Sequence, residues 1–347
     1  MLTLRDLNRA TLARQHLLTP FDGPVGEVVG RVGGLQAQEP RPPYLGAWAR
    51  LARFERADLH AALHARTLVR ATLWRGTLHL VTAADFAAFR PLLDEVLSGA
   101  LSSRFPGVAF DGVIEAAGKM LAEDGPLTFN EIRPRLQTLF PDVNDRALGY
   151  AVRMLMPLTM APTGDPWSFP RDAAFGLPGL TLTPAAKEDL VTRHLAAFGP
   201  ATVADVQAWS GLGGLKPILN GMPLDRLRDE RGRELFDLPG APLPGGGAEA
   251  PVRFLPDFDT LLLGHADRGR IVDPAFPVTT KNLRVRAVYL SDGFVAGTWQ
   301  IKRTARKATL LLSPFTPVPR ARLEEEALRL LAFAEPDAPA LEVVEQV

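Results

Sequence analysis

The spacing of apolar positions along the chain predicts short helices separated by small two-stranded ribbons. Through the first 65 residues, apolar positions recur at helical intervals, and glycine or proline divides one run from the next. The segment 68–81 differs, because its β-branched and aromatic residues, with a glycine past the middle, predict a two-stranded ribbon. Several helices followed by a small hairpin are the pattern of a winged helix. The helices predicted from this spacing cover residues 4–18, 25–31, 44–52, 57–65, 83–97, 111–123, 129–140, 145–156, 184–197, 203–210, 216–222 and 320–333.

The unit of helices and hairpin recurs twice more along the chain. In the second copy, residues 157–169 are predicted to be strand-like around a turn at 163–166, and in the third copy a short wing is predicted at 231–235. The copies agree in layout and not in residue identity. Proline and glycine are dense in residues 241–251, which are therefore predicted to form a linker.

Beyond the linker, the pattern becomes that of β-structure. Residues 252–256 predict one strand, and 285–290 with 294–299 predict a hairpin around the turn signal Asp292-Gly293. We expect an α+β protein with three tandem winged-helix (helix-turn-helix) units and a C-terminal small β-barrel or sheet. The expected divisions are 1–100, 101–182 and 183–240 for the three units, 241–251 for the linker and 252–347 for the β-domain.

Composition narrows the class of protein. The chain has 347 residues, of which 46% are hydrophobic and 22% charged, and it contains no cysteine, so disulfides and thiolate chemistry are excluded. No run approaches the roughly 20 apolar residues of a membrane span, and the N-terminus lacks an apolar signal core. We expect a cytoplasmic protein.

Charge is balanced overall and uneven locally. The formal net charge is zero, which argues against a surface that is basic everywhere. A basic groove is still compatible with this balance, because residues 281–307 hold seven basic residues against Asp292 alone. Arginine suits phosphate contact because its planar guanidinium donates two parallel hydrogen bonds.

One short segment carries the first candidate chemistry. Gly33 and Gly34 can end the preceding helix through positive φ, and Pro40 favours extended geometry at the residue before it. In extended chain, residues two apart share a face, so Gln36 and Gln38 would direct two amides to one point. The alternative is a polar junction between helix and loop whose amides only satisfy backbone groups.

Other candidate sites are weaker. His60 and His64 share a helix face, but the glutamate of the metalloprotease motif is missing between them, and no Cys/His cluster supports zinc, so no metal is expected. Arg75 and His79 place a cation and an imidazole on the predicted ribbon; the alternative is a wing with a half-buried histidine. Residues 254–268 mix acids, apolar residues and a Leu-Gly-His triplet; the alternative there is a structural loop. No phosphate-binding glycine loop or G-x-S-x-G context occurs.

Four short motifs in one order resemble a known family. They are Leu35 to Gln38, Trp74 to Val81, the segment Leu255 to Arg268 and Gly297 to Trp299. Together they resemble the tandem winged-helix DNA glycosylases of the AlkZ/YcaQ type, over nearly the whole chain. The Gln-x-Gln motif matches the AlkZ-like branch, whereas the YcaQ-like branch has Gln-x-Asp.

The resemblance implies a C-shaped scaffold around duplex DNA and excision of N7-alkylated guanines, with interstrand crosslinks as further substrates in some members. It implies that Gln36 and Gln38 are catalytic, positioning water and stabilising a cationic sugar. No lysine precedes Lys119, so a monofunctional glycosylase without lyase chemistry is expected. The resemblance implies duplex DNA that carries alkylated purines as the partner, and therefore association with the nucleoid. We expect a monomer without a cofactor. The residues expected to contact DNA are Arg75, His79, His265, Arg268, Lys302, Arg303, Arg306 and Lys307.

Two other classes of protein stay open at this point. A winged-helix transcriptional regulator would read a specific operator with one recognition helix, for which 145–156 is the best candidate. That helix contains Arg146 and Arg153 but few other side chains suited to reading bases. An architectural or partner-binding protein would use the winged helices for docking and would lack DNA affinity.

Overall fold

The computed structural model describes residues 1–346, and it confirms that the protein mixes helices and sheets, as expected of an α+β protein. Helix α1 (Leu4–Arg14) begins at Thr3, whose side chain accepts a hydrogen bond from the Asp6 backbone while the Asp6 carboxylate caps Thr3 in return. Two such reciprocal bonds satisfy amides that a helix start leaves free. The chain then forms α2 (Val25–Arg31), α3 (Pro42–Trp48) and α4 (Arg56–His64).

The predicted ribbon at 68–81 is confirmed and belongs to a larger sheet. Strands β2 (Leu68–Thr72) and β3 (Leu78–Thr82) pair antiparallel across a short 3-10 turn, η1 (Trp74–Gly76). The sheet order is β1-β3-β2-β4-β5, where β1 is Leu35–Gln36, β4 is Thr159–Met160 and β5 is Phe175–Gly176. Strand β4, which lies in the segment expected to form the wing of a second unit, and its partner β5 therefore extend the sheet of the 68–81 ribbon.

The helix predicted at 83–97 is wrong as a single element. The chain forms α5 (Ala83–Phe89), a 3-10 turn η2 (Pro91–Leu93) and α6 (Asp94–Arg104). Pro91 explains the break, because proline has no N–H to donate and its ring clashes with the preceding turn of a helix. The next three helices are α7 (Val113–Asp124), α8 (Phe129–Leu139) and α9 (Asp145–Leu155), close to the predicted bounds.

The segment expected to form a third unit contains three helices and a hairpin. Helices α10 (Lys187–Phe198), α11 (Val203–Ser210) and α12 (Lys216–Gly221) precede a separate hairpin of β6 (Asp225–Arg228) and β7 (Glu234–Asp237). The predicted wing at 231–235 is thus the turn and the second strand of a longer hairpin.

The predicted linker 241–251 is an irregular segment fixed to α1. The Arg5 Nε donates to the Gly246 carbonyl at 2.7 Å, and the Gly246 amide donates to Asp6 Oδ1 at 2.6 Å. One turn along α1, Arg9 Nε donates to the Ala248 carbonyl at 2.7 Å. These bonds join the linker to the helical part of the molecule.

The C-terminal part is an open sheet and not a barrel. Its order is β12-β11-β10-β9-β8, so β12 and β8 are both edges. Helix α13 (Arg320–Ala334) packs on the sheet, and β12 pairs parallel with β11, which the sequence did not predict. The strands are β8 (Arg253–Leu255), β9 (Val288–Ser291), β10 (Phe294–Arg303), β11 (Ala308–Pro314) and β12 (Leu341–Glu345), and the 3-10 turns η3 (Thr260–Leu262) and η4 (Arg268–Arg270) follow β8.

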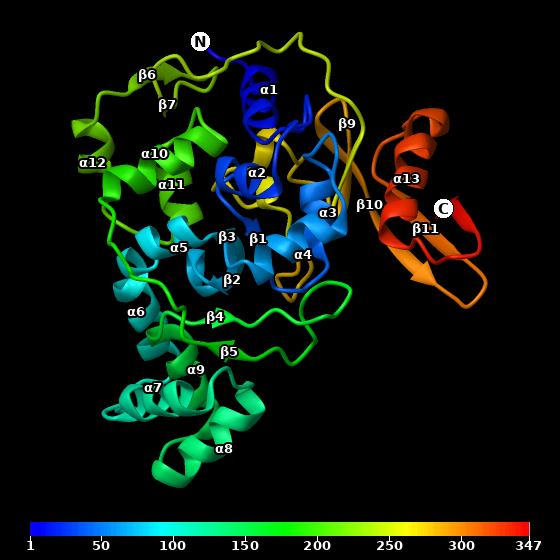
Figure 1. The fold of residues 1–347 in the computed structure, drawn as a ribbon. Helices are drawn as coiled ribbons and strands as arrows, with labels where there is room; N and C mark the ends of the chain where they lie inside the picture. Colours follow the sequence, from blue (N-terminus) through cyan, green and yellow to red (C-terminus); the bar gives the residue numbers. More distant parts are fainter. Residues whose placement is uncertain (347) are drawn as a thin grey trace.

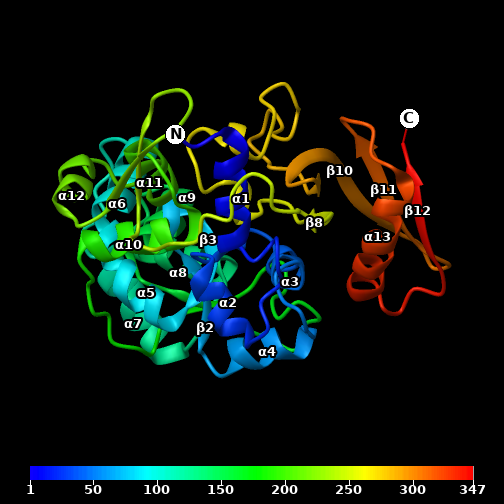
Figure 2. The same cartoon turned by 90° about the horizontal axis from the view of Figure 1, so that it is seen from above.

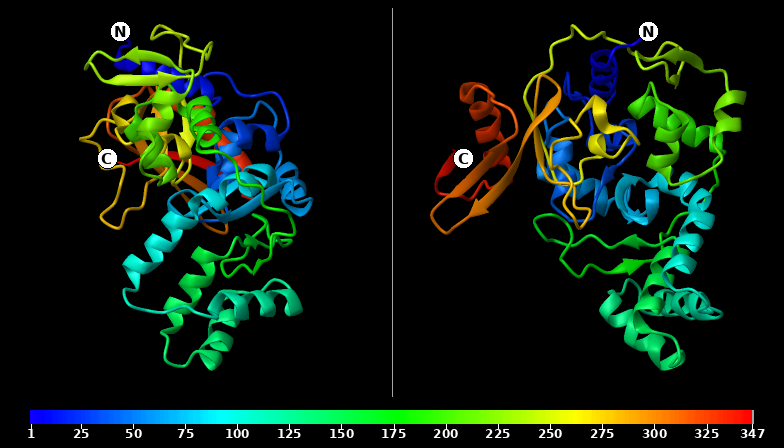
Figure 3. Two further views of the ribbon diagram at one scale, coloured as in Figure 1. Left: turned by 90° about the vertical axis from the view of Figure 1, so that its left-hand side faces the viewer. Right: turned by 180° about the vertical axis from the view of Figure 1, so that it is seen from behind.

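A central body contains α1–α4 and the sheet β1-β3-β2-β4-β5, and the other helices and the C-terminal sheet lie around it (Figure 1). Figure 1 shows α7–α9 below this body and the C-terminal sheet with α13 to its right. Seen from above, the C-terminal sheet projects away from the helices (Figure 2), and the right-hand view of Figure 3 shows the same separation. Within residues 1–346, every helix is too short or too polar to cross a bilayer.

Candidate active site

The chain leaves α2 at the glycine pair, as expected, and the residues that follow, Leu35 and Gln36, form strand β1 of a sheet. Gly33 and Gly34 have φ of 76° and 89°, and the Gly34 amide donates to the Val29 carbonyl at 2.9 Å, which ends the helix. A Cβ on Gly34 would lie 2.7 Å from the Val81 Cγ1, so a side chain has no room there. The segment then pairs antiparallel with β3, with Gln36 opposite His79.

The two glutamine amides have different surroundings. Gln36 is 8% exposed, and its Oε1 is buried without a hydrogen-bond partner among the described residues. Gln38 is half-buried, and its Oε1 accepts the Leu78 backbone N–H at 2.8 Å. Buried polar atoms are nearly always paired, so an unpaired amide oxygen requires an explanation. Gln38 thus completes the strand pairing, whereas the Gln36 oxygen serves no contact in the fold.

Arg70 fixes the backbone of the same segment and was missed by sequence reasoning. From β2, its Nε donates to the Ala37 carbonyl at 2.8 Å and its Nη2 to the Gln38 carbonyl at 3.1 Å. The guanidinium lies over the Phe169 ring, 4.9 Å from its centroid. Burial lowers the pKa of Arg70 to about 10, while the charge of Glu39 acts in the opposite direction. The one available signal was an arginine in the middle of an otherwise apolar strand.

The ribbon residues Arg75 and His79 face the protein interior. Arg75 is half-buried at positive φ (55°), and its Nη1 donates to the Trp209 carbonyl of α11 at 2.5 Å. His79 is 2% exposed and its Nδ1 lies 3.0 Å from the Thr77 carbonyl. Burial, with the nearby charge of Arg75, lowers the pKa of His79 to about 3, so the imidazole opposite Gln36 is uncharged. Neither side chain is placed at an open surface.

Residues 254–268, which include the Leu-Gly-His triplet, form a structural loop whose polar groups contact other parts of the protein. His265 is 5% exposed, with its Nε2 2.9 Å from the Phe198 carbonyl, and His194 makes the matching contact to the Gly264 carbonyl. Any Cβ on Gly264 would overlap the Phe198 ring, which explains the glycine. Asp259, within the same segment, forms a fully buried ion pair with Arg50 at 2.7 Å. The segment therefore contacts α10 through Gly264 and His265 and the residues just after α3 through Asp259.

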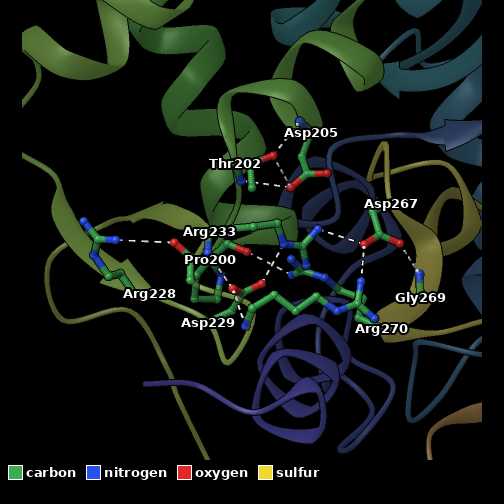
Figure 4. Close-up of polar contacts among 11 residues, drawn as sticks. Pro200, Thr202, Asp205, Arg228, Asp229, Arg233, Asp267, Gly269 and Arg270 are labelled. Carbon is green, nitrogen blue, oxygen red and sulfur yellow. Dashed lines mark hydrogen bonds and ion pairs between the residues drawn. The ribbon is translucent and has the colours of Figure 1, made fainter.

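The residues that follow His265 make further contacts with other parts of the protein. Asp267 accepts from Arg233 at 2.8 Å and from the Gly269 amide at 2.9 Å, and Arg270 donates to the Pro200 carbonyl at 2.9 Å (Figure 4). Arg268 is half-buried and its Nη1 donates to Thr279 Oγ1 at 3.1 Å. Arg268 thus holds the base of the next loop by a contact within the protein.

A groove of about 890 Å³ begins directly beyond the glutamines. Glu39 and Arg41, just before α3, line one wall, and Arg284, Arg286 and Gln300 from the C-terminal part line the other. Arg41 is paired with Glu335 at 2.8 Å, and Arg284 with Asp257 at 3.0 Å. Arg286 is exposed and forms no ion pair with residues 1–346, so it is a cation available to a ligand.

The basic turn between β10 and β11 lies at the outer end of the C-terminal sheet, away from the helical body (Figures 1 and 3). All four of its cations are exposed. Lys307 pairs with Glu342 at 2.5 Å and Arg303 with Glu335 at 3.5 Å, whereas Lys302 and Arg306 form no ion pair within the described chain. Lys302 and Arg306 are therefore the members of this turn that can contact phosphate without displacing a carboxylate.

The two histidines of α4 converge on one carbonyl. The rings of His60 and His64 stack at 4.2 Å, and their Nε2 atoms lie 3.2 Å and 3.3 Å from the Thr163 oxygen. In residues 1–346, no three histidine or carboxylate side chains are grouped so that they could hold a metal ion. The pair contacts the loop that joins β4 to β5.

Comparison with known proteins then assigns the chain. The family model described as "DNA glycosylase AlkZ-like" matches residues 29–333. The chain belongs to the AlkZ-like DNA glycosylase family. The matched residues include the Gln36–Gln38 segment, Arg70 and most of the residues that line the groove. Membership identifies the protein as a DNA glycosylase and disfavours the regulator, whose proposed recognition helix α9 has Arg153 half-buried near Thr72.

Two matches from one organism agree with this assignment. A protein of Streptomyces sahachiroi named "Interstrand DNA cross-link repair glycosylase" is 27% identical over 348 residues, covering 91% of this chain and 92% of that protein. The solved structure of Streptomyces sahachiroi DNA glycosylase AlkZ superposes with a TM-score of 0.81 at 23% identity, covering 100% of both chains. The structural match shows a shared fold over the whole length.

Proposed function

We propose that this protein hydrolyses the N-glycosidic bond of N7-alkylated guanine in duplex DNA, and that Gln36 and Gln38 are its catalytic residues. The observation that carries the proposal is the buried Oε1 of Gln36, which has no partner among the described residues. Gln36 lies on an edge strand that pairs with β3, and Arg70 binds the carbonyl of the next residue, Ala37. An acceptor without a structural role, fixed in place, suits a reacting group that becomes positive or a water that attacks it.

The chemistry requires little acid catalysis. N7-alkylation already places positive charge on the base, so the base leaves as a neutral molecule and the sugar becomes oxocarbenium-like. An amide oxygen stabilises that cation and orients a water without being ionised. A neutral amide is a poor base, so the water loses its proton after attack, when its acidity has risen. The glutamines therefore orient the reactants and stabilise the transition state.

The surroundings favour Gln36 for the direct role and Gln38 for a shared one. The uncharged imidazole of His79, opposite Gln36, adds no positive charge next to a cationic sugar. An amide oxygen has two lone pairs, so the bond that Gln38 accepts from Leu78 leaves one acceptor position. Arg70 holds the carbonyls that flank both side chains and acts as a positioning residue.

We extend the proposal to two finer properties. The Streptomyces sahachiroi relative is named as an interstrand cross-link repair glycosylase, and a similar substrate range is proposed here because the groove is large and lies at the surface. Lysine is absent before Lys119, so the strand that carries the glutamines has no nearby amine in its own unit for a Schiff base. The protein is therefore proposed to be a monofunctional glycosylase that leaves an abasic site.

The decisive experiment compares the double variant Gln36→Ala/Gln38→Ala with the wild type. Each is incubated with a duplex that holds one 7-methylguanine, and free base and abasic sites are measured. The wild type should release base and form no borohydride-trapped complex, whereas the double variant should release none while binding the duplex within a few fold. Excision that persists in the double variant contradicts the assignment of the glutamines, and a wild type without excision contradicts the proposed activity. A duplex joined through N7 of two guanines tests crosslinks in the same way.

A further inference from the structure

The loop of residues 278–286 has an ordered base and a projecting tip. Its two sides are joined by the hydrogen bonds from the Arg286 amide to the Val278 carbonyl at 3.0 Å and from the Thr280 amide to the Arg284 carbonyl at 2.9 Å. The Leu283 amide donates to the Thr280 carbonyl at 2.9 Å, which closes the tip. The 278–286 loop is therefore a defined hairpin-like element.

Leu283, at this tip, combines two unfavourable properties. Its side chain is 79% exposed, and its backbone is left-handed, with φ of 58°. Left-handed backbone disfavours an L-residue other than glycine, asparagine or aspartate, and burial that would compensate for an apolar side chain is absent. The adjacent residue, Asn282, is of a type that tolerates this conformation. Strained residues cluster at functional sites, so the tip is a candidate for contact with a ligand.

The charges around Leu283 indicate the kind of ligand. Lys281, Arg284 and Arg286 are exposed around it, and Lys281 and Arg286 form no ion pair with residues 1–346. A protein-binding patch would place several apolar residues together and exclude charge from its centre. A single apolar side chain among cations fits a duplex, in which phosphates flank a stack of bases.

The loop is close to the candidate catalytic strand. Thr280, Arg284 and Arg286 line the groove whose opposite wall begins at Glu39, one residue after Gln38. The hydrogen bond and charge of Asp257 raise the pKa of Arg284, and the charge of Glu39 contributes in the same direction. Glu39 acts similarly on Arg70, the anchor of the Gln36–Gln38 strand. A duplex bound in the groove would therefore meet both elements.

We propose that Leu283 is a wedge that enters the base stack of the bound duplex beside the damaged nucleotide, while Lys281 and Arg286 contact the flanking phosphates. The inference rests on the proposed function for its ligand, duplex DNA. Apolar side chains inserted between base steps separate the bases and bend the duplex. Separation is easiest at a damaged nucleotide, so the wedge would expose the glycosidic bond where the glutamines act.

The test measures separation of bases without requiring excision. The duplex carries 2′-fluoro-7-methylguanine, whose glycosidic bond resists hydrolysis, next to 2-aminopurine, whose fluorescence rises when it is unstacked. Leu283→Asn removes the apolar side chain and keeps a residue that accepts left-handed backbone, and Leu283→Gly is a second variant of the same kind. Leu243→Asn is the matched control, because Leu243 is also exposed (43%) but lies in the 241–251 segment.

The wild type and Leu243→Asn should give the same rise in fluorescence at saturation, and both Leu283 variants should lose most of it. With a cleavable 7-methylguanine, the Leu283 variants should excise about tenfold more slowly, with duplex affinity changed only a few fold. Full fluorescence in both Leu283 variants overturns the wedge even if excision is normal. A fluorescence rise that depends on Leu283, in a protein that releases no base, supports the wedge and contradicts the proposed activity alone. Failure to bind any duplex overturns both.

Discussion

Gln36 offers a test in which stability and activity should move in opposite directions. Gln36→Met replaces the buried amide by an unbranched apolar side chain of similar length. A buried polar atom without a partner destabilises a fold by about 1–3 kcal/mol, and a volume-conserving exchange costs less than about 1.5 kcal/mol. Because Gln36 Oε1 has no partner in the fold, we expect the variant to be as stable as the wild type or up to about 2 kcal/mol more stable, while excision is lost.

Gln15 supplies the matched control for this experiment. Its side chain is also buried, but its Nε2 donates to the carbonyls of Val32 and Ala197, and its Oε1 accepts from Arg50. Gln15→Met leaves these partners unpaired, so it should destabilise the protein by several kcal/mol, on the scale of about 1–3 kcal/mol for each buried group. Urea unfolding followed by the fluorescence of the buried Trp74 and Trp209 measures both variants. If Gln36→Met loses as much stability as Gln15→Met, or retains excision, the reasoning about the unpaired oxygen is refuted.

Four further predictions follow from contacts in the same region and beyond it. Arg70→Lys keeps a charge but cannot donate to two carbonyls in the planar geometry of arginine, so kcat should fall while duplex affinity stays within a few fold, as single-turnover excision and titration would show. Asp259→Ala leaves Arg50 as an unpaired buried cation and should lower the free energy of unfolding by about 3–5 kcal/mol; a loss below about 1 kcal/mol in urea would contradict a buried pair. Burial lowers the pKa of His79 to about 3 and of His194 to about 4, so the unfolded chain binds more protons than the folded one below the ordinary histidine pKa of 6.5. The free energy of unfolding should therefore be highest above that pH and fall on acidification between about pH 6.5 and 4, by up to about 1.4 kcal/mol per pH unit for each histidine. A free energy of unfolding in urea that does not change with pH would be inconsistent with both pKa shifts. Charge reversal of Lys302 and Arg306 should weaken duplex binding at all sequences and reduce the number of ions released on binding, read from the salt dependence of the affinity, by about two. Reversal of Arg303 and Lys307, which are paired with carboxylates, should change that salt dependence less. An unchanged salt dependence in the first variant would show that the turn does not contact phosphate.

Local signals in the sequence predicted most elements and failed where distant segments meet. The bounds of α2 and α11 match the prediction because each helix is delimited by its own residues: Pro24 and the Gly33 pair for one, Thr202 and Gly211 for the other. Strand β12 was missed because its pairing with β11 is parallel and depends on the fold of α13 between them. The closure of the β-domain was likewise not decided by local pattern, and the strand order resolved it as an open sheet.

The candidate site shows the same division. That the chain is extended at Gln36 follows from its neighbours in sequence, and the structure confirms it. The different surroundings of Gln36 and Gln38 do not follow, since they depend on Leu78 and Arg70, which lie more than 30 residues away. His79 and His265 matched motifs and are buried, because a motif records which residues occur and not whether they line a surface or a core. The groove combines α3 with the β-domain and has no local signal in the sequence.

The mode of attachment explains how an unpaired oxygen can persist at the edge of the sheet. β1 is only two residues long, so its own pairing with β3 holds Gln36 weakly. Three further contacts compensate: Gly34 packs against Val81, Arg70 binds the carbonyls of Ala37 and Gln38, and the Gln38 amide takes the Leu78 N–H. Each contact acts on a residue beside Gln36, and none uses the Gln36 amide. The segment is thus ordered by its neighbours while one acceptor remains free, and under the proposed function a neutral oxygen held in this way would stabilise a cation without first having to reorganise.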